Sequence, residues 1–241
     1  MSPPPIDLQR AVCRRRAAAA GVPLLTPDAP QLVREAIALA AAAVSPRTLA
    51  EVRAGTSFYT PRLVGALWQL LPESVEAPLR AVGVDLHATG AVYLSSAAWD
   101  RSPCGTVAHE LSHGRRDRVV SAGGVIVSAL WIAGYLFHPT VTGWEEGTCR
   151  VNDLVALVVF DGLSVDDALK AAAAGVDAYA LSASGREAYL AALESAAASL
   201  RAGQLPGVDT EVHAMARALV AEGWDAGPWA EAIGAALPEG T

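Results

Sequence analysis

The spacing of apolar and polar residues divides the chain into helical stretches and one strand region. Apolar residues recur three and four positions apart over residues 30–44 and 61–71, which predicts two helices. Residues 82–96 instead alternate and are rich in β-branched side chains around Gly90, which predicts a strand or a hairpin. The chain therefore contains segments with the apolar spacing of helices and one segment with the alternation typical of a strand.

Start and stop signals place the remaining helices. Ser102 followed by Pro103 is a typical helix start, so a helix is predicted over residues 103–116. Another is predicted over about residues 144–160, where an apolar run ends at Asp-Gly. From Ser164 onward the sequence predicts Ala-rich helices separated by the turns GQLPGVD and GWDAGPW.

These elements predict a mostly helical α+β fold with a small sheet ahead of the helix at residues 103–116. We expect residues 1–44 to form a Pro-rich arm and a helix. Residues 45–163 are expected to form the central unit, and residues 164–241 an Ala-rich helical region packed on it.

Composition and charge narrow the class of protein. Of 241 residues, 52% are hydrophobic and 18% are charged, which is enough apolar material for a folded core. Eighteen basic residues against twenty-five acidic ones give a net charge of −7. A nucleic-acid-binding protein usually has a broad basic excess, so nucleic acid is not an expected partner.

The cysteines and the N-terminus indicate the compartment. Cys13, Cys104 and Cys149 are odd in number and form no CxxC pair, so neither a disulfide framework nor a cysteine zinc knuckle is predicted. Three arginines precede a short apolar run near the N-terminus, but Gly21 and Pro23 interrupt that run, unlike a secretory signal. We therefore expect a cytoplasmic protein.

The segment TVAHELSHGRR, residues 106–116, carries the strongest chemical signal. Residues four apart on a helix lie on the same face, so His109 and His113 can bind one ion through neutral imidazole nitrogens. Glu110 lies about 100° around the helix from His109, where it can reach a metal-bound water without being a ligand. This pattern predicts a zinc site with Glu110 as its general base.

A catalytic zinc ion normally has three protein ligands, so the third must come from elsewhere. The metzincin spacing is excluded, because Arg116 stands where that pattern has glycine and Val119 where it has histidine. About thirty residues downstream, GWEEGTCRVNDLVALVVF begins with Glu145 and Glu146 ahead of an apolar run of helical length.

HELSH followed by WEEG resembles the gluzincin metallopeptidases over about residues 82–160. The resemblance implies a zincin-like core, zinc as cofactor, and a peptide or protein as substrate. We expect this substrate to lie as an added strand against residues 91–96, AVYLSS. It implies that His109, His113 and Glu146 are the metal ligands, with Glu145 as the second choice for the third position, and that Glu110 is the catalytic base. One departure is Arg115, which stands where the extended motif usually has an apolar residue.

Other ligand assignments stay open. GTCRVND is similar to the GTxxD element of the aspzincins, but Val151 occupies the aspartate position and Asp153 comes two residues later. Asp117 and Asp153 are better suited to accept a hydrogen bond from a ligand histidine, because such histidines usually donate their second N–H to a carboxylate. Both also fit an ordinary exposed charge network.

Several other residues are candidates near such a site. Stabilisation of an oxyanion needs a hydrogen-bond donor. The candidate donors are His138, Tyr135, Tyr179 and His213. His87 can line a cleft beside the strand, which is predicted to be an edge strand. Cys104 lies in the first turn of the motif helix, where the dipole lowers a thiol pKa, and Cys149 lies one turn after Glu146. Packed or surface positions are the alternative for each.

Residues 119–137, VVSAGGVIVSALWIAGYLF, form an uncharged run nominally long enough to cross a bilayer. The histidine motif lies before this run and Glu146 after it, so one crossing would separate groups that share a metal. We therefore expect a buried helix, or a hairpin broken at Gly123 and Gly124, and no membrane partner.

The second functional hypothesis is a non-catalytic structural or interaction protein that keeps the zincin fold. Its support is the Ala-rich, apolar composition and the uncharged run, which would form a partner surface if it were exposed. The sequence does not indicate the oligomeric state.

Overall fold

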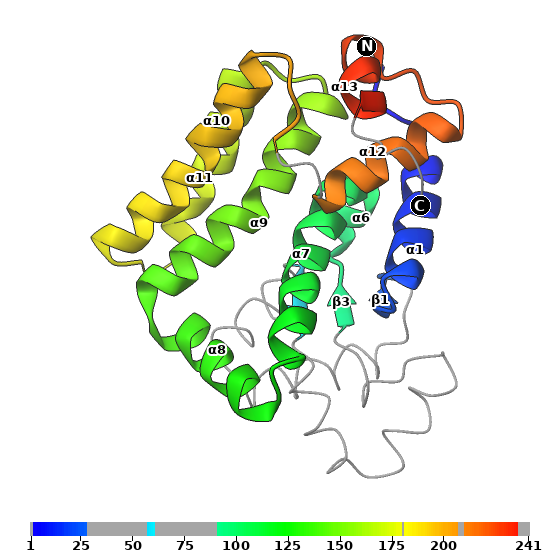
Figure 1. Cartoon of the computed structure of the whole chain (residues 1–241). Helices are drawn as coiled ribbons and strands as arrows, with labels where there is room; N and C mark the ends of the chain where they lie inside the picture. The colour runs from blue at the N-terminus through cyan, green and yellow to red at the C-terminus, as the bar shows by residue number, and fades with distance from the viewer. Residues whose placement is uncertain (1, 28–56, 61–90, 180, 207–209, 236–241) are drawn as a thin grey trace, which may run out of the picture.

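The computed structural model describes residues 2–27, 57–60, 91–179, 181–206 and 210–235 (Figure 1). The helices expected over residues 30–44 and 61–71 lie outside the described residues. The part of the expected strand region at residues 82–90 lies outside them too. His87 lies outside them as well.

The described chain is an α+β structure in which helices dominate, as the sequence predicts. Its first half contains α1 (Ile6–Ala19), β1 (Leu24–Leu25), β2 (Phe58–Thr60), β3 (Ala91–Tyr93), α6 (Ser96–Arg101) and α7 (Pro103–Ser121). The second half contains α8 (Val125–Phe137), α9 (Pro139–Val159), α10 (Val165–Ala174), the 3₁₀ turn η1 (Gly175–Ala178), α11 (Ala183–Arg201), α12 (Glu211–Ala221), the 3₁₀ turn η2 (Gly227–Trp229) and α13 (Ala230–Ala235).

The sheet is small and mixed, with strand order β1-β3-β2. β3 pairs in parallel with β1 and antiparallel with β2. Ala91 and Val92 are buried, so this strand belongs to the core. The strand expected immediately before the motif helix is therefore present at residues 91–93, but as the central strand of the sheet and not as an edge.

α7 and α9 form the centre of the molecule (Figure 1). Each begins with a proline in its first turn, where the missing N–H would have no helical partner. α7 begins at Pro103 as expected and extends past residue 116 to Ser121, whereas α9 begins at Pro139, more than a turn before the predicted start. The two helices pack directly against each other.

Small residues set the distances between these helices. A Cβ added at Gly105 of α7 would lie 2.8 Å from the Cβ of Ala156 on α9. On the other side of α9, a Cβ at Gly147 would lie 2.6 Å from the Cα of Tyr189 on α11. Because real Cβ atoms do not approach that closely, these glycines allow α9 to fit between α7 and α11.

The N-terminal and C-terminal helices pack on this centre. α1 contacts α7 and α12, and α11 and α10 contact α9. One continuous hydrophobic cluster includes Val12 of α1, Leu111 of α7, Leu154 of α9, Leu193 of α11 and Leu219 of α12. Segments from both ends of the described chain therefore contribute to the same core.

The uncharged run at residues 119–137 is more exposed than the sequence predicts. A break occurs at Gly123 and Gly124, as one alternative predicted, and Gly124 has a φ of +92° that favours glycine. α8 then joins α7 to α9 but is largely exposed: Ile126 is 76% exposed and Phe137 is 80% exposed. The expected burial of the whole run is therefore wrong, because Ser128 and Ile132 are its only buried residues among those whose burial the structure describes.

No single helix among the described residues is both long enough and apolar enough to cross a bilayer, although α8 and α9, bent by 93° at their junction, have the length and apolar composition as a pair.

Candidate metal centre

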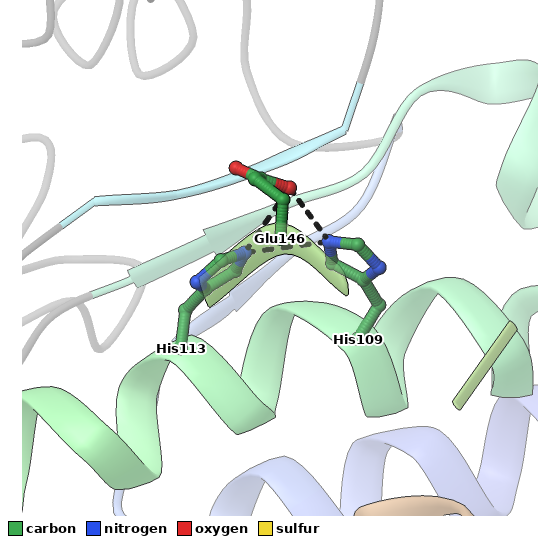
Figure 2. Close-up of side chains that lie close together, drawn as sticks. All are labelled: His109, His113 and Glu146. Carbon is green, nitrogen blue, oxygen red and sulfur yellow. Dashed lines mark hydrogen bonds and ion pairs between the residues drawn. The ribbon is translucent and has the colours of Figure 1, made fainter. Parts of the chain in front are cut away.

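Three donor groups converge between α7 and α9. His109 and His113 lie one turn apart on α7, and Glu146 reaches them from α9 (Figure 2). The two histidine Nε2 atoms are 3.3 Å apart, and the Oε2 atom of Glu146 lies 3.6 Å from Nε2 of His109 and 3.9 Å from Nε2 of His113. The structure thus brings together the three ligands expected from the sequence.

These distances fit a metal ion of the size of zinc. Tetrahedral ligand atoms bound at about 2.0 to 2.1 Å lie about 3.3 Å from one another. The three observed distances, 3.3, 3.6 and 3.9 Å, equal this value or exceed it by up to about 0.6 Å. Two imidazole nitrogens and one carboxylate oxygen also form a donor set that zinc accepts, with a fourth position left for water.

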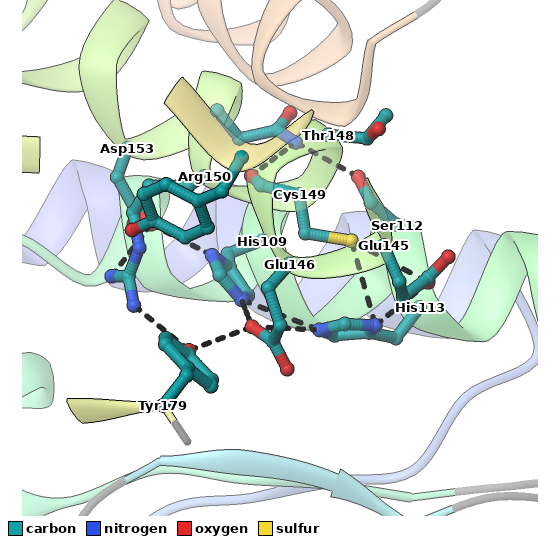
Figure 3. Close-up of polar contacts among 12 residues, drawn as sticks. His109, Ser112, His113, Glu145, Glu146, Thr148, Cys149, Arg150, Asp153 and Tyr179 are labelled. Atoms are coloured by element: carbon teal, nitrogen blue, oxygen red, sulfur yellow. Dashed lines mark hydrogen bonds and ion pairs between the residues drawn. The ribbon is translucent and has the colours of Figure 1, made fainter. Parts of the chain in front are cut away.

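The other nitrogen of each imidazole is held by a carboxylate. Nδ1 of His109 lies 2.7 Å from Oδ2 of Asp153, and Nδ1 of His113 lies 2.9 Å from Oε1 of Glu145 (Figure 3). An Nδ1–H that donates to a carboxylate leaves Nε2 as the metal-binding nitrogen and fixes the ring orientation. Both histidines are therefore oriented so that their Nε2 atoms face Glu146.

Two tyrosines hold the carboxylate of Glu146. The hydroxyl of Tyr179 donates to Oε2 at 2.7 Å, and the hydroxyl of Tyr135 donates to Oε1. Arg150 connects this carboxylate to His109, because its Nη1 donates to Asp153 at 3.0 Å and its Nη2 donates to the hydroxyl of Tyr179 at 3.2 Å (Figure 3). One guanidinium therefore contacts the partners of two of the three candidate ligands.

Glu145 is placed beside the ligands and not among them. Its carboxylate accepts from His113 and forms an ion pair with Arg116, whose guanidinium lies over the ring of Trp144. The thiol of Cys149 lies 3.5 Å from Nδ1 of His113, on the same side of the ring as Glu145. Between the two neighbouring glutamates, the geometry favours Glu146 as the ligand.

Burial and charge shift the pKa values of the three candidate ligands. Burial lowers the pKa of His109, but the nearby carboxylates of Asp153 and Glu146 outweigh it and raise that pKa to about 10. Burial raises the pKa of Glu146, whereas its hydrogen bond with His109 and the charges of both histidines hold it well below its usual range. Burial lowers the pKa of His113. The metal-free site therefore holds its proton on His109.

Glu110 follows His109 on α7 and is only 6% exposed. Burial raises its pKa, and the charges of His109 and His113 oppose that rise. The carboxyl group therefore lies within the electrostatic field of the candidate ligands. A carboxyl group with a pKa shifted toward neutrality is suited to take up and return a proton.

Four further candidate site residues from the sequence are described by the structure: Asp153, Asp117, His138 and His213. Asp153 contacts His109 as expected for a hydrogen-bond acceptor, whereas Asp117 accepts from the hydroxyl of Tyr59 at 2.8 Å. His138 is exposed at the N-cap of α9, and His213 is buried in α12. Asp117 is thus held by β2 and not by a ligand histidine.

Cys104 and Cys149 are both buried, as their interpretation as small packed residues predicts, whereas the lowered thiol pKa expected for Cys104 from the helix dipole is wrong. The hydrogen bond with Cys13 raises the pKa of the Cys104 thiol well above its ordinary value, and burial raises it further. The two thiols contact each other, and this contact outweighs the effect of the helix dipole.

Two contacts were not predicted from the sequence. The link from Arg150 through Tyr179 to Glu146 joins α9 to the segment after η1, and only the spacing of Arg150 and Asp153, three residues apart on one helix, hinted at it. The contact between Tyr59 and Asp117 joins β2 to α7 over a long separation in sequence. The contact between Tyr59 and Asp117 carries no local sequence signal, because 58 positions separate the two residues.

Comparisons with protein-family models, with curated protein sequences and with solved structures found no match to this chain.

Proposed function

We propose that this protein is a zinc-dependent peptidase of gluzincin type with a zincin-like core. The observation that carries the proposal is the convergence of Nε2 of His109, Nε2 of His113 and Oε2 of Glu146 at the spacing of a tetrahedral metal site. A surface helix with two solvated histidines would not have a carboxylate within 3 Å of each imidazole Nδ1, nor a His109 that is only 5% exposed, as this one has.

Each group has a role in this proposal. A bound zinc ion would supply a water of lowered pKa and polarise a peptide carbonyl. The carboxylate of Glu110 would accept a proton from such a water and return it to the leaving amine. Asp153 and Glu145 orient the two imidazoles, and the tyrosines 135 and 179 orient the carboxylate of Glu146.

The route by which substrate enters differs from the sequence expectation. A peptide was expected to add as a strand beside residues 91–96, but β3 already pairs with β1 on one side and with β2 on the other. Its N–H and C=O groups are therefore not available to a peptide, and β-augmentation at β3 is excluded.

Zinc content and a conservative substitution test the proposal. The metal content of the purified protein is measured, and cleavage of a broad library of quenched fluorescent peptides is compared between wild type and Glu110→Gln. We expect one bound zinc ion in both proteins and a loss of cleavage of about 10²- to 10⁴-fold in the variant, because only the proton acceptor is removed. Glu187→Gln, at an exposed position on α11, is the matched control and should cleave like wild type.

Three outcomes would count against the proposal. A folded protein that binds no zinc would refute the metal centre. Cleavage by Glu110→Gln at the wild-type rate would refute the role of the base. A zinc-loaded protein that cleaves no peptide would favour the non-catalytic alternative.

A further inference from the structure

Two cysteines meet in the core, away from the metal centre. Cys13 lies on α1 and Cys104 in the first turn of α7, and their Sγ atoms are 3.6 Å apart. Both side chains are 0% exposed, and both belong to the main hydrophobic cluster. The third cysteine, Cys149, lies beside His113 and takes no part in this contact.

We propose that Cys13 and Cys104 form a reversible disulfide bond that fastens α1 to α7. A disulfide requires its sulfur atoms to lie about 2.05 Å apart, so the sulfurs must approach by about 1.5 Å. The two helices already pack against each other, so the bond needs no rearrangement of the fold.

A small oxidised thiol, such as glutathione disulfide, balances the reaction. The thiolate of one cysteine attacks a sulfur of the glutathione disulfide, which forms a mixed disulfide and releases one glutathione. The second cysteine then displaces the other glutathione, and the two protons lost by the protein thiols pass to the two released glutathione thiolates. Because both thiols are buried, we expect this exchange to occur when α1 separates transiently from α7.

The cross-link would connect the N-terminal helix to the helix that carries the histidines. Cys13 and Cys104 are 91 positions apart in the sequence, and a cross-link between distant positions restricts the unfolded chain more than one between close positions. α1 is otherwise fastened by apolar packing and by ion pairs such as Arg16 with Glu211. The oxidised protein should therefore be more stable than the reduced one.

Thiol counting tests the proposal. The full-length protein is equilibrated in an oxidising glutathione buffer, and a second sample is refolded from denaturant in the same buffer so that access to buried thiols does not limit the reaction. Free thiols are then alkylated under denaturing conditions, and the masses of the intact chain and its peptides are measured.

We expect one alkyl group, on Cys149, and one peptide pair that joins Cys13 to Cys104. The midpoint of thermal unfolding should rise by roughly 5 to 10 °C and return to its starting value when a phosphine reductant is added. Cys13→Ser and Cys104→Ser should each abolish the cross-link and the rise, whereas Cys149→Ser should preserve both. Three alkylated cysteines in both samples, or a bond that includes Cys149, would overturn the proposal.

Discussion

Binding of zinc should release about one proton at pH 6, and that proton should come from His109. In the metal-free protein the pKa of His109 is raised to about 10, so this imidazole is protonated at pH 6. The pKa of His113 is lowered by burial and that of Glu146 lies below its usual range, so neither carries a full proton to release. Zinc binds only neutral imidazole, so it must displace the proton of His109.

The affinity for zinc should therefore become about tenfold tighter for each pH unit between pH 5.5 and 6.5, because one proton competes with the metal. Working below pH 7 avoids ionisation of the zinc-bound water, whose pKa is about 7. Calorimetric titration in buffers of different ionisation enthalpy measures the number of protons directly. Asp153→Asn removes the main group that raises the pKa of His109, so the count should fall below one.

The same shift fixes the pH dependence of the metal-free fold. A raised pKa of His109 contributes stability that is fully present below its unfolded value of about 6.5 and is lost as pH approaches 10. The midpoint of thermal unfolding of the metal-free protein should therefore fall over that interval. Release of no proton at pH 6, or a metal affinity independent of pH, would refute the reasoning.

Three further predictions concern contacts around the site. Arg150→Lys should weaken zinc binding about 10- to 100-fold in a chelator competition assay, because one ammonium cannot bond both Asp153 and the Tyr179 hydroxyl. Gly147→Ala should lower the free energy of unfolding by about 1 to 3 kcal/mol in urea, because the added Cβ meets α11. Tyr59→Phe should cost about 1 to 3 kcal/mol in the same assay, since it leaves buried Asp117 without its 2.8 Å hydrogen bond.

Matched controls separate these effects from general damage. Arg186→Lys alters an exposed arginine that pairs with Asp177, and it should leave zinc affinity unchanged. Gly134→Ala, on α8, places a Cβ no nearer than 3.8 Å to Val141 and should stabilise the protein by about 0.5 to 1 kcal/mol. A Gly147 variant as stable as Gly134→Ala, or an unchanged urea midpoint for Tyr59→Phe, would contradict the packing described above.

The local parts of this structure could be predicted from the sequence, and the long-range parts could not. The start of α7 at Pro103 and the shared face of His109 and His113 follow from signals within a few residues. The prediction of Glu146 as the third ligand depends on the resemblance of WEEG to a known motif, and the structure brings this glutamate to the two histidines. The helix that carries it begins earlier than expected because Pro139 starts it.

The features that differ from the sequence predictions are those that depend on tertiary contacts. The exposure of α8 and the central position of β3 depend on which surfaces neighbouring segments cover, and hydrophobicity alone does not show that. The thiol pKa of Cys104 depends on Cys13, which comes from a distant helix. A prediction that considered only the N-terminus of α7 therefore had the wrong sign.

The order of the chain has a consequence for how the site assembles. All three candidate ligands, and both carboxylates that orient the imidazoles, lie on α7 and α9 between Pro103 and Val159. Bringing them together closes a loop much shorter than the whole chain, so little entropy is lost before α11 and α12 have folded. We therefore expect a metal ion present during refolding to nucleate this helical pair and speed its formation, with the C-terminal helices docking afterwards.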